Sequence, residues 1–161
     1  MSLFNMFRSK ESLPKFRVII AGSRGFNDDQ LMWAMMDKFL SEKKLTHEIV
    51  VLSGCARGAD SLGEYYATSR HYKIRRYPAK WDKLGRFAGV MRNREMAENA
   101  DALVAFWDGE SRGTEHMINI AHEKGLHVRV VQFVPGPEPE EPVESPGTIG
   151  DLLKRMEGVE L

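Results

Sequence analysis

The chain has 161 residues, of which 42% are apolar and 29% are charged, and its 23 basic residues balance 23 acidic ones. This length and composition fit one globular domain and exclude a collagen-like or wholly disordered chain. The zero net charge argues against a protein whose main task is to coat DNA or RNA. Cys55 is the only cysteine, so no intrachain disulfide can form, and no apolar run has the length of a signal peptide or a membrane span. We therefore expect a cytoplasmic protein without a membrane partner.

Five short apolar or β-branched runs alternate with helix-patterned stretches, which is typical of βαβ units around a parallel sheet. The first two runs are nearly all apolar, as strands covered on both faces must be. The third carries charge and is followed by Pro78, which favours a position near an edge. The predicted strands are 17–21, 48–52, 74–77, 102–107 and 127–133. We expect an α/β fold: a Rossmann-like three-layer α/β/α sandwich with a mostly parallel five-stranded sheet of order 3-2-1-4-5.

Four helices are expected between these strands. In the first, Asp28 and Asp29 suit the positive end of the helix dipole. The other three are predicted at about 59–69, 87–99 and 114–124. Apolar residues of the first helix recur at spacings of three and four and form one face that we interpret as core packing: Leu31, Met32, Met35, Met36, Phe39 and Leu40.

The composition changes after Phe133. Five of the seven prolines follow it, interleaved with glutamates, and residues 134–161 hold seven acidic against two basic residues. Such a stretch cannot build a core. We expect an N-terminal extension over 1–15, one Rossmann-like domain over 16–134, and a Pro/Glu-rich linker over 135–161 that includes a short helix at 149–156. That helix either docks on the domain or contacts a partner.

Three predicted loops carry glycine and arginine together, after strands 17–21, 48–52 and 102–107. Ligands of open parallel sheets bind at the carboxyl ends of the strands, where the strand order reverses, and the expected order makes these three strands neighbours. Glycine lets backbone amides approach a ligand, a following helix adds free amides, and arginine matches phosphate oxygens. The candidate ligand-binding residues on these loops are Gly22, Ser23, Arg24, Gly54, Arg57, Gly58, Gly109, Ser111, Arg112, Gly113 and Thr114.

A fourth segment, 81–96, adds an aromatic residue and several arginines. Arg92 and Asn93 are expected near the start of the third helix, from which they reach the same crevice. Trp81 either caps the core or stacks on a base. On the loop after the second strand, Asp60 is expected to brace backbone amides, and Cys55 to be a small residue in a tight turn.

Several other chemistries find little support. The chain contains no G-x-x-x-x-G-K-S/T, and its first loop reads G-x-x-G rather than G-x-G-x-x-G, which disfavours a P-loop NTPase and a dehydrogenase. The five histidines show no close metal-ligand spacing. We therefore expect no metal and no required cofactor.

Taken together, four motifs resemble the SLOG superfamily, specifically its YspA-like, cpYpsA-related branch. They are Gly22-Ser23-Arg24, the run 53–60, Arg92-Asn93-x-x-Met96, and Gly109-x-Ser111-Arg112-Gly113-Thr114, and the resemblance covers about 17–133. It implies a Rossmann-like fold shared with the DprA DNA-processing proteins and the LOG phosphoribohydrolases. It also implies binding of nucleotides or nucleotide-derived signals such as NAD or ADP-ribose, and it makes a homodimer an expectation.

The resemblance leaves the type of activity open. LOG enzymes carry P-G-G-x-G-T-x-x-E with a catalytic glutamate, but here Met117 stands three residues after Thr114, and a thioether cannot move protons. The first hypothesis is a module that binds a phosphorylated, nucleotide-type small molecule as a signal sensor in bacterial or phage conflict systems. The alternatives are nucleotide N-glycosidic cleavage, with Glu115 or Asp108 as acid or base, and DprA-like binding of single-stranded nucleic acid.

Overall fold

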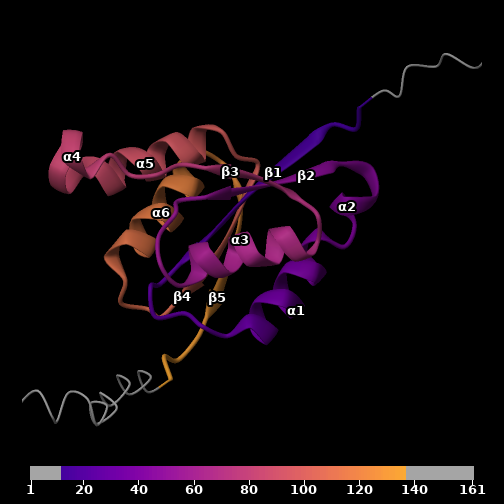
Figure 1. The fold of residues 1–161 in the computed structure, drawn as a ribbon, viewed down its shortest axis with the longest axis horizontal. Coiled ribbons are helices and arrows are strands. Elements are labelled where there is room, and N and C mark those ends of the chain that lie inside the picture. Colours follow the sequence, from indigo (N-terminus) through magenta and orange to yellow (C-terminus); the bar gives the residue numbers. More distant parts are fainter. Residues whose placement is uncertain (1–11, 137–161) are drawn as a thin grey trace, which may run out of the picture.

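The computed structural model describes residues 12–136 and contains a five-stranded sheet of order β3-β2-β1-β4-β5 (Figure 1). Every neighbouring pair of strands is parallel. The predicted fold class and strand order are thus confirmed, and β3 lies at an edge as its charge and Pro78 indicate. The strands are β1 (Lys15–Gly22), β2 (Glu48–Ser53), β3 (Lys73–Arg76), β4 (Ala102–Trp107) and β5 (His127–Gln132).

The side chains of β1 alternate between two apolar layers. Val18 and Ile20 belong to the layer covered by α1 (Asp29–Leu40) and α3 (Ala59–Ser69). Ile19 and Ala21 belong to the layer covered by α5 (Ala88–Glu98) and α6 (Arg112–Glu123). Helices on both faces explain why β1, β2 and β4 are almost wholly apolar.

The helix predictions hold closely for the long helices. The helix expected at 59–69 has those bounds, and Asp28 caps α1 by accepting a hydrogen bond from the Leu31 amide at 2.9 Å. Met32 and Met36 of α1 are fully buried, which confirms core packing for the methionine-rich face.

Three single-turn elements were not predicted: α2 (Lys43–Thr46), α4 (Trp81–Leu84) and the 3₁₀ turn η2 (Gly85–Phe87). None of them contains a buried residue, so none leaves an apolar periodicity in the sequence. Figure 1 shows α4 at the outer end of α5, beyond the strands.

Residues 1–11 and 137–161 are outside the described range. Most of the predicted N-terminal extension, and the Pro/Glu-rich segment with its helix at 149–156, therefore lie outside the described residues. Within residues 12–136, no helix combines the length and the apolar character that crossing a bilayer requires.

Candidate functional site

A crevice of about 90 Å³ lies at the carboxyl edge of the sheet. Its walls come from the end of β1, the loops that follow β1, β2 and β4, and helices α3, α5 and α6, so the three predicted loops do meet. The lining residues are Ala21, Gly22, Arg24, Ala56, Asp60, Arg92, Asn93, Met96, Ser111, Gly113, Thr114 and Met117.

Two glycines allow these loops to pack so closely. A Cβ atom on Gly22 would lie 2.1 Å from the carbonyl oxygen of Phe106 and 2.8 Å from the Cβ of Ala59. Gly58 has a φ of +75°, and a Cβ there would lie 2.4 Å from the carbonyl oxygen of Ser23. Both positions therefore require glycine for the approach of α3 and β4 to the loop after β1.

Ser23 ties the first loop to the third. Its amide donates to the Phe106 carbonyl at 2.9 Å, and its hydroxyl accepts a hydrogen bond from the Asp108 amide at 3.2 Å. The side chain is buried and is absent from the crevice lining. The structure therefore gives this candidate ligand residue a bracing contact between loops.

Asp108 closes the turn that leads into α6. Its Oδ1 accepts hydrogen bonds from the amides of Ser111 at 2.8 Å and Glu110 at 2.9 Å, around Gly109 at a φ of +85°. Partial burial works to raise the pKa of Asp108, but these amides and the Ser23 hydroxyl outweigh it and hold the pKa below its ordinary value. Asp108 is thus an ionised turn residue at neutral pH.

The first turn of α6 opens onto the crevice. Ser111 caps the helix by accepting from the Thr114 amide at 3.4 Å, and the two hydroxyl oxygens lie 3.0 Å apart. Gly113 lines the crevice, and a Cβ on it would meet no atom within 4 Å. Because first-turn amides lack acceptors within a helix and lie at its positive end, this end of α6 suits an anion.

Arg92 and Asn93 lie in the middle of α5 rather than near its start, yet both line the crevice. The Arg92 guanidinium donates to the carbonyl of Gly54 and, through Nε, to Asn93 Oδ1 at 3.0 Å. Asn93 Nδ2 donates to the carbonyl of Gly113 at 3.2 Å and lies 3.1 Å from His116 Nδ1. These bonds join α5 to the loop after β2 and to the start of α6.

Asp60 forms part of the crevice floor and is 4% exposed. Its Oδ2 accepts a hydrogen bond from the Ala56 amide at 3.3 Å, as expected for a residue that braces its loop. Burial raises the pKa of Asp60, while the Ala56 amide and the charge of Arg92 act in the opposite direction.

The predicted arginines separate into two groups. Arg24 and Arg92 line the crevice and place positive charge at it. Arg57 and Arg112 are exposed and are not among its lining residues, and the same holds for Glu115. Within residues 12–136, no three His, Cys, Asp or Glu side chains are grouped so that they could hold a metal ion.

The apolar part of the lining was not among the candidate ligand-binding residues. Ala21, Ala56 and Met96 lie in the crevice wall, and Met96 is buried. Helical spacing carries the signal for Met96, because it follows Asn93 by three residues and so lies on the same face of α5. Met117 follows Gly113 by four residues and shares the crevice face of α6 in the same way.

Comparisons with known proteins show the family and the fold of the chain. The profile of the YspA, cpYpsA-related SLOG family matches residues 16–84, which include the loops after β1 and β2. The Gene 61 protein of Mycobacterium phage D29 is 34% identical over 119 residues, which are 70% of this chain and 93% of that protein.

Two solved structures of DNA processing protein A share the fold. The protein from Helicobacter pylori, reported with its single-stranded DNA binding mode, superposes with a TM-score of 0.51 at 18% identity, over 89% of this chain and 74% of that one. The protein from Streptococcus pneumoniae gives a TM-score of 0.51 at 20% identity, over 92% of this chain. The chain covers only 58% of the Streptococcus pneumoniae protein.

Proposed function

Because the chain belongs to the YspA, cpYpsA-related SLOG family, we propose that its crevice binds the phosphate of a nucleotide or of a nucleotide-derived molecule such as ADP-ribose or NAD. One observation carries the proposal: Arg24, Arg92 and the first turn of α6 at Gly113 converge on one crevice. Two guanidinium groups and free helix amides are the donors that phosphate oxygens accept most readily.

The proposal is recognition without turnover. Among the described residues that line the crevice there is one carboxylate, Asp60, and it already accepts the Ala56 amide. Met117 occupies the lining, and its thioether cannot transfer protons. The proposed role is that of a signal sensor in bacterial or phage conflict systems, and the 34% identical relative comes from a phage.

The test is a thermal-shift panel with AMP, ADP-ribose, NAD and cyclic nucleotides, followed by calorimetric titration of each hit. A ligand that binds the native state raises the melting temperature. Arg24→Ala should weaken the binding of a hit by about tenfold to a hundredfold, since a hydrogen bond from a charged group contributes about 1.5–3 kcal/mol. Arg75→Ala is the matched control, because Arg75 is an exposed arginine of β3 outside the crevice lining. Equal losses of ligand affinity in Arg24→Ala and Arg75→Ala would contradict the proposal.

Product analysis of each hit tests turnover. If a hit is consumed, and Glu115→Gln or Asp108→Asn stops its consumption without preventing binding, the protein is an N-glycosidase-type enzyme. An intact ligand after prolonged incubation supports recognition alone.

A second candidate function is binding of single-stranded nucleic acid. Its supporting observation is a pair of exposed aromatics, one of them beside a cation: Trp81 is 55% exposed, Phe87 is 58% exposed, and the guanidinium carbon of Arg86 lies 5.1 Å from the centre of the Phe87 ring. Exposed aromatics beside positive charge form stacking platforms for single strands. Binding of single-stranded DNA at physiological salt, with no thermal shift from any nucleotide, would favour this candidate over the first.

A further inference from the structure

The crevice is smaller than the ligand class proposed for it. Sites for small molecules enclose roughly 300–1,000 Å³, whereas the crevice encloses about 90 Å³. It therefore accommodates a phosphate group but not a complete nucleotide. If the proposed function is correct, the base and part of the sugar must lie in a space next to the crevice.

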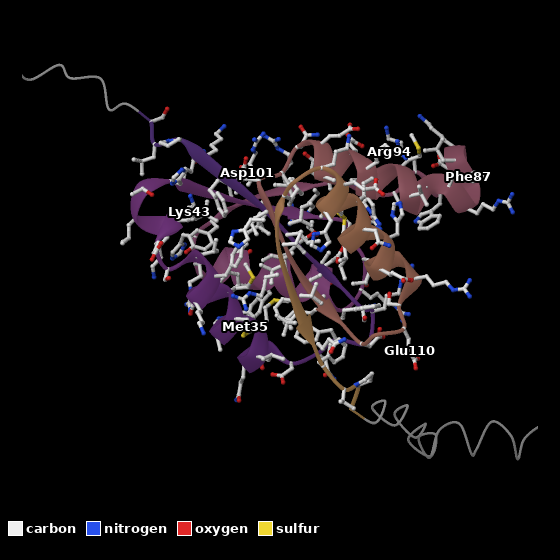
Figure 2. All side chains as sticks on the ribbon, turned by 180° about the vertical axis from the view of Figure 1, so that it is seen from behind. Met35, Lys43, Phe87, Arg94, Asp101 and Glu110 are labelled. Carbon is white, nitrogen blue, oxygen red and sulfur yellow. The ribbon has the colours of Figure 1, made fainter. Side chains whose placement is uncertain are left out.

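A larger cleft of about 280 Å³ adjoins it along the outer side of α5. Arg92 is a lining residue of both spaces. The opposite wall of the cleft is the chain that leaves β3, where the Tyr77 amide donates to the Ser53 carbonyl at 2.8 Å and Pro78 follows at the carboxyl edge. Figure 2 shows Arg94 and Phe87 on the arm of α5, η2 and α4 that carries this cleft.

The cleft has the chemistry of a base site. Pro78, Leu84 and Met91 give it apolar walls, and Leu84 and Met91 are 40% and 49% exposed. Glu95 adds a carboxylate that can accept hydrogen bonds from amino or ring N–H groups, and Lys80 adds a cation. Apolar walls with a few polar groups are the usual surroundings of a bound planar ring.

Two other clefts among the described residues fit less well. One of about 410 Å³ shares no lining residue with the crevice, and Asp28 and Asp29 in its wall would repel a phosphorylated ligand. The other, of about 280 Å³, is lined by Phe16 and His127, which lie at the starts of β1 and β5 and thus at the opposite edge of the sheet.

We propose that the crevice and the cleft between α5 and segment 78–84 form one elongated site, joined at Arg92, in which a nucleotide places its phosphate in the crevice and its base against Leu84 and Met91. This rests on the proposed function and assigns the base position within it. It also gives Leu84 and Met91, two exposed apolar side chains of this arm, a ligand to cover them.

The experiment compares AMP with ribose 5-phosphate by calorimetric titration on the full chain. AMP should bind at least about fivefold more tightly, because only AMP reaches the cleft. Met91→Asp should reduce AMP binding to the level of ribose 5-phosphate and leave ribose 5-phosphate binding unchanged. Val90→Asp is the matched control, since Val90 is a neighbouring exposed apolar residue that does not line the cleft. It should change neither affinity.

Equal affinities for AMP and ribose 5-phosphate, or equal effects of the two aspartate variants, would overturn the elongated site and leave the phosphate crevice standing. No binding of AMP, of ribose 5-phosphate or of any ligand in the thermal-shift panel would instead contradict the proposed function. Light scattering on Met91→Asp gives a further readout: a change in oligomeric mass with unchanged AMP affinity overturns the base site and assigns the apolar surface to a protein partner.

Discussion

Replacement of Gly22 by alanine should destabilise the domain severely. The new methyl carbon would lie 2.1 Å from the Phe106 carbonyl oxygen and 2.8 Å from the Ala59 Cβ, and the first of these belongs to the backbone of a central strand. Overpacking of this kind costs about 1–3 kcal/mol. Displacement of β4 also strains the 2.9 Å hydrogen bond from the Ser23 amide to Phe106, which contributes about 1 kcal/mol.

We therefore expect the free energy of unfolding to fall by about 3 kcal/mol, because alanine regains less than about 1 kcal/mol through the unfolded chain. With an m-value of about 1.5 kcal/mol/M, the urea midpoint should drop by about 2 M. Gly25→Ala is the control, since its Cβ would meet no atom within 4 Å and its φ is not positive. The reasoning is refuted if Gly22→Ala and Gly25→Ala have the same midpoint.

Three further predictions concern the crevice and the acid stability of the fold. Gly113→Ala should weaken phosphate-ligand binding in titration calorimetry without lowering the urea midpoint, because its Cβ meets no protein atom but lies at the crevice. Arg57→Ala should reduce ligand affinity less than Arg24→Ala in the same assay, since only Arg24 lines the crevice. The bond from Arg70 lowers the pKa of Asp37 below its ordinary value of 3.8. The stability that this carboxylate contributes is thus complete above that value and is lost as the pH falls through the lower folded pKa. Between pH 5 and pH 2.5 the urea midpoint should therefore fall less for the Asp37→Asn variant than for the unsubstituted protein.

The sheet was predictable because its signals are local. Apolar runs specify β1, β2 and β4, and the charge of β3 with Pro78 places it at the edge. The single turns α4 and η2, which precede α5, were not predictable in the same way, because they contain no buried residues. The bounds expected for α5 are close to those observed, but Arg92 and Asn93 lie in the middle of this helix rather than near its start.

The composition of the crevice was predictable only in part. Glycine and arginine after three strands indicate that loops meet, but the sequence does not say which arginine reaches the crevice. Arg92 does so from α5, through a bond to Gly54 that depends on how α5 packs against the sheet. Ser23 is engaged by Asp108 because the register pairs Gly22 with Phe106, and such a pairing between distant segments leaves no local signal.

The position of Cys55 has a practical consequence for measuring ligand binding. It is the single cysteine of the chain, it is exposed, and it lies beside Gly54 and Ala56, of which the first accepts the Arg92 bond and the second lines the crevice. A thiol-reactive fluorophore would attach at this one position without any introduced mutation. A ligand that engages Arg92 would then change the surroundings of the dye, so the protein carries its own attachment point for an optical reporter.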